Sequence, residues 1–249
     1  MFTPTGRDGL LQRLVAQART DSSVTAAALV GSAARRQTDR WSDIDLAFRL
    51  SPGTDPAAVA DVWSSHLAHA VEVADHLDIW AGPALFRAHL LADSLQVHLS
   101  FWPSSEFAAN GQPFELLFGE ANPSRDPAEA DPHMLVGWAW LYALHLRSAL
   151  ARRRHWQAVE MLEGLRRQLT ALLCLRHGVP VSQGRGVDRL PADVLASLEA
   201  TLVARPAGDL LRAALRAAID LLLSEVGHTD PALALRLQAP LQMLCADLA

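Results

Sequence analysis

Residues 29–46 read LVGSAARRQTDRWSDIDL, and they indicate how the first half of the chain folds. The apolar run from Val24 to Val30 ends at a Gly-Ser step, and a second apolar run, Ile44 to Leu50, follows after a polar segment. Glycine at the end of a short apolar run is typical of a turn. The pattern therefore predicts a strand, a turn into a short helix near Gly31, and a second strand.

Two carboxylates, Asp43 and Asp45, open the second of these strands. Strand side chains alternate between faces, so both aspartates are expected on one face, with Ile44 in the core. Neighbouring carboxylates repel each other unless a cation lies between them, and Mg²⁺ binds oxygen ligands while keeping waters and substrate phosphates. The pair predicts a Mg²⁺ site for a nucleotide. The alternative is that Asp43 caps a turn and Asp45 lies exposed on an edge strand.

The same stretch contains candidates for holding phosphate. All 22 cationic side chains of the chain are arginines, so phosphate contacts must come from arginine, backbone N–H groups or a metal ion. Gly31 allows close approach of the backbone, and the N–H groups that follow it, with the Ser32 hydroxyl, can donate to phosphate oxygens. Arg35 and Arg36 carry guanidinium forks suited to bidentate phosphate contacts. We therefore predict these four residues as nucleotide-binding.

The pattern Val30-Gly31-Ser32 followed by Asp43-Ile44-Asp45 resembles the nucleotidyltransferase superfamily of the DNA polymerase β type. Within it, the Gly31 to Arg35 start, the Trp41 to Leu46 segment and a helical second half look like bacterial enzymes that adenylylate small molecules, including aminoglycoside and lincosamide antibiotics. The resemblance implies transfer of AMP from ATP to a hydroxyl of a small molecule by two-metal, in-line displacement. It also implies a role in antibiotic resistance.

The resemblance requires a third carboxylate on a later strand, and here that position is His98. The matching strand is Leu95 to Trp102, in which alternation places Gln96, His98 and Ser100 on one face. Histidine is a poor ligand for Mg²⁺ but can accept a hydroxyl proton. His98 is therefore predicted as a catalytic base beside the two aspartates. The alternatives are that Glu106 or Asp93 supplies the acid, or that turnover has been lost.

A non-catalytic function is the second hypothesis. A degenerate nucleotide-binding protein of the same fold, with a regulatory or antitoxin-like role, fits the same motif when the third carboxylate is missing. Both hypotheses predict Mg²⁺-dependent nucleotide binding at Asp43 and Asp45. They differ in whether His98 supports turnover.

The sequence pattern changes near residue 125. Helix and strand patterns alternate before this point, and helical patterns alone follow it. The fold class predicted is α+β, with a small mixed-sheet nucleotidyltransferase domain over residues 1–125 and an all-helical domain over 126–249 that closes on acceptor and nucleotide. The elements expected in the first half are helices over 8–19 and 55–70 and strands over 24–30, 44–50, 76–80 and 95–102. Five helices are expected in the second, over 135–154, 156–177, 192–204, 209–226 and 231–247.

Composition limits the partners and the compartment. The 249 residues are 50% apolar and carry a formal net charge of −5, which argues against a protein that coats nucleic acid. The longest apolar stretch, Met134 to Leu144, is too short to span a bilayer. Only two cysteines are present, without metal-site or disulfide spacing, so the cytoplasm is the expected location. A homodimer is one alternative for the oligomeric state.

Overall fold

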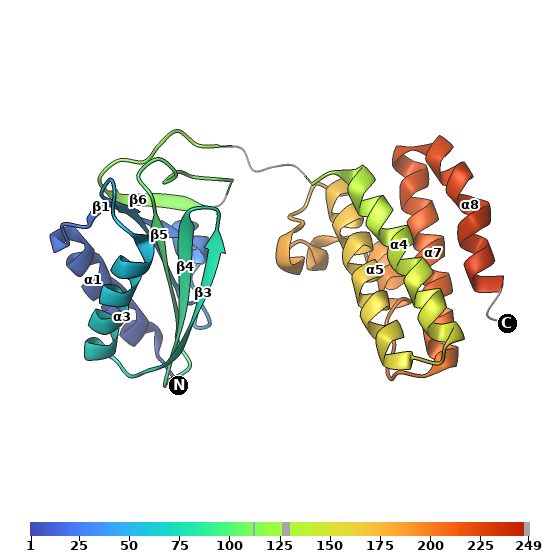
Figure 1. The fold of residues 1–249 in the computed structure, drawn as a ribbon, viewed down its shortest axis with the longest axis horizontal. Coiled ribbons are helices and arrows are strands. Elements are labelled where there is room, and N and C mark those ends of the chain that lie inside the picture. The colour runs from blue at the N-terminus through green and yellow to red at the C-terminus, as the bar shows by residue number, and fades with distance from the viewer. Residues whose placement is uncertain (112, 126–129, 247–249) are drawn as a thin grey trace. The chain divides into compact units, whose positions relative to one another are not determined.

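The computed structural model describes residues 1–111, 113–125 and 130–246 (Figure 1). By its internal contacts the chain divides into two compact units, Met1–Ala128 and Glu129–Ala249. The boundary expected from the sequence, after residue 125, adjoins residues 126–129, which lie outside the described ranges.

The first unit is a six-stranded mixed sheet with the order β3-β4-β5-β2-β1-β6. Strands β2 and β5 are parallel, and every other neighbouring pair is antiparallel. The elements are α1 (Pro4–Thr20), β1 (Val24–Val30), α2 (Gly31–Ala34), β2 (Ile44–Leu50), α3 (Pro56–Ala70), β3 (Val73–Ala81), β4 (Ala84–Leu91), β5 (Gln96–Trp102) and β6 (Phe114–Phe118). The predicted α+β class is confirmed, and β1 and β2 have the predicted bounds.

The two faces of the sheet differ in their covering. Helices α1 and α3 lie against one face of the sheet (Figure 1). There Phe48 packs against the fully buried Trp63 of α3, with ring centroids 4.4 Å apart and the rings tilted by 34°. Alternation along β2 directs Ile44 and Leu46 into this core. Asp45 therefore faces the opposite side, which we call the open face of the sheet.

The second unit is a helical bundle. It contains α4 (Pro132–Ala151), α5 (His155–Arg176), the single 3₁₀ turns η1 (Ser182–Gly184) and η2 (Val187–Arg189), α6 (Ala192–Glu199), α7 (Gly208–Thr229) and α8 (Pro231–Ala246). Helices α4, α5, α7 and α8 run side by side around an apolar core rich in leucine and alanine (Figure 1). In the described parts of the chain, no helix is long and apolar enough to cross a membrane.

Several predicted helix ends were wrong. Helices α1 and α4 begin earlier than expected because Thr3 and Asp131 cap them and the proline that follows each cap occupies the first helical position. The break expected at Gly227 is absent, since α7 continues to Thr229 and the chain turns at Asp230 instead. Helix α6 ends at Glu199 rather than at residue 204. The predicted end of the last helix, at residue 247, lies outside the described residues.

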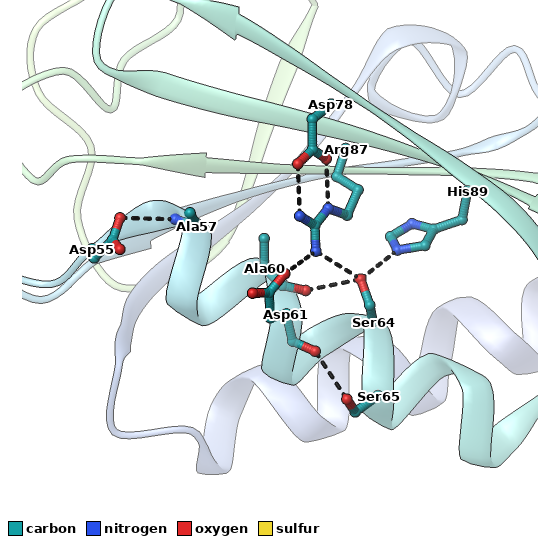
Figure 2. Close-up of polar contacts among 9 residues, drawn as sticks. All are labelled: Asp55, Ala57, Ala60, Asp61, Ser64, Ser65, Asp78, Arg87 and His89. Atoms are coloured by element: carbon teal, nitrogen blue, oxygen red, sulfur yellow. Dashed lines mark hydrogen bonds and ion pairs between the residues drawn. The ribbon is translucent and has the colours of Figure 1, made fainter.

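Strands β4 and β6 were not predicted. Strand β6 has only five residues, and β4 lacks a simple apolar alternation because its buried face carries Arg87 and His89. Both side chains are satisfied by partners on other elements. Figure 2 shows the Arg87 guanidinium between Asp78 of β3 and Asp61 of α3, at 2.6–2.8 Å. This ion-pair network ties α3 to the β3–β4 hairpin.

His89 is buried in the same cluster and is held as a neutral imidazole. Its Nε2 points to the Ser64 hydroxyl of α3 (Figure 2), at a distance of 2.9 Å. Its Nδ1 lies 3.3 Å from the Val97 carbonyl. Burial lowers the pKa of His89 from 6.5 to about 4, and the nearby Arg87 charge acts in the same direction. Between pH 6.5 and about pH 4, His89 is therefore protonated in the unfolded chain and neutral in the folded chain.

We predict that the free energy of unfolding falls as the pH drops from 7 to 5, and that His89 accounts for about 2 kcal/mol of this loss. His89→Gln keeps a hydrogen-bonding group for Ser64 but cannot titrate, so its stability should change less between the two pH values. Urea unfolding at both pH values measures the difference. The control is His66→Gln, an exposed histidine of α3, which should keep the wild-type pH dependence. An equal pH dependence in His89→Gln would contradict the prediction.

Candidate functional site

Asp43, Asp45 and His98 come together on the open face of the sheet. One potential ligand atom from each lies within 4.8 Å of the other two, and all three side chains are half-buried. The parallel pairing of β2 with β5 places Asp45 directly beside His98, and Asp43 lies two residues before Asp45, immediately before β2 begins. Strand β2 is interior to the sheet, so the alternative that Asp45 lies on an edge strand was wrong.

The hydrogen bonds of His98 indicate which nitrogen carries its proton. Its Nδ1 lies 3.1 Å from Asp45 Oδ1, and its Nε2 lies 2.5 Å from the Gln96 side-chain amide nitrogen. A carboxylate oxygen only accepts, so the Nδ1–H of His98 donates to Asp45. Asp45 therefore orients the imidazole and leaves its basic nitrogen on the side away from the carboxylate.

The electrostatics of the cluster indicate that it is short of positive charge. Burial and the neighbouring Asp45 carboxylate raise the pKa of Asp43. The hydrogen bond to Asp45 and the two negative charges raise the pKa of His98 against the opposing effect of burial. The Asp45 carboxylate contributes to both shifts, whereas burial adds to the shift of Asp43 and opposes that of His98. A divalent cation bound between Asp43 and Asp45 would relieve this repulsion.

Gly31 is required where β1 ends and α2 begins. Its φ of +65° lies in the left-handed region that favours glycine, and a Cβ at this position would collide with Asp45 Oδ2. The Gly-Ser turn is therefore pressed against one oxygen of Asp45, while His98 binds the other. Two of the predicted parts, the turn and the carboxylate, are in contact.

The residues predicted to contact phosphate lie in and beside this turn, and their surroundings differ from one another. The Ser32 carbonyl accepts from the backbone N–H groups of Arg35 and Gln37, which closes the single turn of α2. Arg36 has a φ of +55°, and its exposed guanidinium lies 3.5 Å from Glu115 of β6. A phosphate at Arg36 would compete with that carboxylate, whereas Arg35 ends α2 without such an ion pair in the described parts of the chain.

The other two candidates for the third acid lie elsewhere. Glu106 forms a 2.7 Å ion pair with Arg125, and Asp93 accepts from the Leu95 backbone N–H in the turn before β5. Neither belongs to the cluster that the described residues form. His98 is therefore the side chain that the sheet brings to Asp43 and Asp45.

Sequence reasoning missed the residues that support the loop before Asp43. Arg7 of α1 is buried and donates to the carbonyl oxygens of Asp39, at 2.5 Å, and Ser42, at 3.3 Å. The Asp39 carboxylate in turn accepts from Trp41 N–H and the Ser42 hydroxyl. These contacts fix the approach of the chain to Asp43. Asp39, two residues before Trp41, is a recognisable Asx-turn signal, but nothing local marks Arg7 as its partner.

No family model matches the chain, and no curated protein is significantly similar to it. Among solved structures, the chain is similar to an aminoglycoside 6-adenyltransferase from Bacillus subtilis, with 12% identity over 98% of this chain and 99% of that chain and a TM-score of 0.40. It is also similar to a nucleotidyltransferase-like protein from Exiguobacterium sibiricum 255-15, with 14% identity over 89% of this chain and 76% of that chain and a TM-score of 0.38.

Gly31→Ala tests the contact between the turn and Asp45. We expect it to lower the free energy of unfolding by more than the ~1–2 kcal/mol that a left-handed backbone costs, because the added methyl group also displaces the Asp45 carboxylate. The matched control is Gly82→Ala, since Gly82 has a φ of +58° but open space around its Cβ position. Urea unfolding and Mn²⁺ titration of both variants measure the effect. Equal losses of stability with intact Mn²⁺ binding would contradict the contact.

Proposed function

We propose that the protein is a nucleotidyltransferase that transfers AMP from ATP to a hydroxyl of a small molecule, an antibiotic being the candidate acceptor. The observation that carries the proposal is the convergence of Asp43, Asp45 and His98 on the open face, with the Gly31 turn against Asp45. Two carboxylates, a proton acceptor and a tight glycine turn are the groups that phosphoryl-type transfer requires in one place.

The donor set fits a hard divalent cation. Asp43 and Asp45 offer carboxylate oxygens, which Mg²⁺ prefers, and a cation between them would oppose the effect of burial and of the Asp45 charge that raises the pKa of Asp43. In this proposal the two aspartates hold Mg²⁺, which when bound neutralises phosphate charge and fixes the nucleotide. The backbone of Gly31 and Ser32 and the guanidinium of Arg35 contact the β- and γ-phosphates, and Arg36 joins them if it leaves Glu115.

His98 is proposed as the base. Asp45 holds the Nδ1–H tautomer, so Nε2 can take the hydroxyl proton once it exchanges its hydrogen bond with Gln96 for one with the acceptor. The acceptor oxygen forms a bond to the α-phosphorus of ATP, the bond from that phosphorus to the bridging oxygen breaks, and pyrophosphate leaves with the bonding electrons. In this scheme Asp45 has two tasks, since it also helps to hold the metal ion.

A specific observation supports the second candidate function, a nucleotide-binding protein without turnover. The His98 imidazole donates to the oxygen of Asp45 that faces it, and a protonated His98 would supply part of the charge that a metal ion supplies otherwise. The two functions share Mg²⁺-dependent binding of a nucleotide at the aspartates. They are separated by the effect of His98 on the rate of pyrophosphate release.

Calorimetric titration of ATP with Mg²⁺ tests the shared part. The wild type should bind, and Asp45→Asn should bind at least 10–100-fold more weakly, because it removes half of the anionic site. Glu72→Gln provides a matched carboxylate-to-amide control, since Glu72 is an exposed residue of the same unit outside the cluster. Undiminished binding by Asp45→Asn would remove the aspartates from the site.

Pyrophosphate release from Mg²⁺-ATP, measured with a panel of aminoglycosides and lincosamides, tests the role of His98. If His98 is the base, His98→Ala should slow release by 10²–10⁴-fold while the Kd for ATP changes little. If the wild type releases none and His98→Asp does, turnover was lost at this position and the second function holds. A His98→Ala rate equal to that of an active wild type would exclude His98 as the base.

A further inference from the structure

Exposed apolar side chains adjoin the candidate site on the open face of the sheet. We call them the apolar shelf: Leu77 and Ile79 of β3, and Phe86, Ala88 and Leu90 of β4. They share the face of His98, because Ala88 pairs with His98 and Leu77 pairs with Ala88. Leu77, Ile79 and Leu90 are 60%, 53% and 50% exposed. Apolar side chains grouped in this way are typical of a binding surface, whereas isolated ones are not.

Trp102 of β5 closes one end of the shelf. Its ring lies edge-on to the Phe86 ring, with centroids 5.2 Å apart, and its indole N–H donates to the Ser100 hydroxyl at 2.9 Å. At about 3.3 Å per residue, the segment from Phe86 to Leu90 extends for ~13 Å, and two strand spacings separate β5 from β3 by ~10 Å. The shelf therefore has room for a molecule of one or two rings beside His98.

The shelf offers few charges to a ligand. Within strands β3, β4 and β5, all of which the structure describes, the one carboxylate on the open face is Asp75, which lies opposite Leu90 at the end of the shelf. Asp75 is exposed, and its Oδ1 accepts from the His76 backbone N–H at 2.8 Å. Asp93 lies in the turn after β4 and accepts from the Leu95 N–H. Exposed charges at the rim contribute little to binding, so a ligand on the shelf depends on apolar contact.

The order of groups across the sheet relates the shelf to the candidate site. Strand β1 ends at the Gly31 turn, β2 carries Asp45, β5 carries His98, and β4 carries the shelf. In the proposed function, phosphate lies at the Gly31 turn and the acceptor hydroxyl lies at His98 Nε2. That nitrogen is 2.5 Å from the Gln96 amide nitrogen, and Gln96 pairs with Leu90 of the shelf. A hydroxyl that takes the place of Gln96 at Nε2 therefore lies next to the shelf, on the side away from the phosphates.

We infer that the apolar shelf binds the acceptor, and that the acceptor is an amphipathic ring compound with an apolar face on the shelf and a hydroxyl at His98. The inference rests on the proposed function and narrows its acceptor class. A polycation would place ammonium groups against Leu77, Ile79 and Leu90, where they lose hydration without gaining a carboxylate. The shelf therefore selects against polycationic acceptors.

Calorimetry with Mg²⁺ and α,β-methylene-ATP, which cannot release pyrophosphate, tests the acceptor class. Lincomycin and clindamycin serve as amphipathic probes, and kanamycin and neomycin as polycationic probes. At least one amphipathic probe should bind with a Kd tenfold or more below that of either polycation. Tighter binding of a polycation, or binding of none of the probes, overturns the inference. Binding of the ATP analogue is measured first, because its absence contradicts the proposed function itself.

A double variant, Leu77→Gln with Leu90→Gln, tests the location. Both side chains are exposed, so the variant should fold, which urea unfolding verifies. We expect its Kd for the amphipathic probe to rise about tenfold and its Kd for the ATP analogue to stay unchanged. The matched control is Leu116→Gln, since Leu116 is a 42% exposed leucine of the open face on β6, beyond β2 and β1 from the shelf. It should keep the wild-type affinity.

Unchanged probe affinity in the double variant, or an equal loss in Leu116→Gln, would overturn the location. Sedimentation velocity identifies the other occupant that an apolar face could have. A dimeric wild type with a monomeric double variant would assign the shelf to a second copy of the chain, which also overturns the inference.

Discussion

The parallel pairing of β2 with β5 is the constraint on which the candidate site depends. Parallel strands begin at the same end of a sheet, so the first residues of β2 and β5 are neighbours although more than fifty residues separate them in the sequence. In the intervening segment, α3 covers one face of the sheet, and the β3–β4 hairpin adds two strands at one side of the sheet before the chain returns to its interior as β5. Asp45 and His98 meet because of this connection, and no local feature of either strand produces the contact.

The unequal covering of the sheet explains how such a polar cluster is tolerated. The helix-covered face holds the larger apolar cluster of this unit, and the buried polar side chains Arg87 and His89 on it have hydrogen-bond partners. The open face is where half-buried carboxylates keep contact with solvent and with ligands. The larger apolar cluster and the candidate site thus lie on opposite sides of β2 and β5, so the site can carry repelling charges without disrupting that cluster.

Local sequence patterns were sufficient to predict the elements whose structure depends on residues close by in the sequence. The apolar runs predicted the bounds of β1 and β2, and alternation predicted that the two aspartates share one face. That His98 lies beside them was predicted from the resemblance to nucleotidyltransferases, and the three side chains do form one cluster. Strand β4 escaped prediction because partners on α3 and β3 permit charged residues on its buried face. Arg7 was missed for a related reason, since its hydrogen-bond acceptors are more than thirty residues away.

Because the third position is His98 and not a carboxylate, bound cations must balance less negative charge at the site. With His98 neutral, Asp43 and Asp45 give the cluster a charge of −2, which one divalent cation offsets. A carboxylate in place of His98 would add a negative charge that favours binding of a second divalent cation. In the proposed function the histidine shifts the task of the third position from metal binding to proton transfer. Asp45 then links the two tasks, because one carboxylate faces the Gly31 turn and also sets the tautomer of the base. The hydrogen bond between Asp45 and His98 therefore couples the proposed metal site to the proposed base.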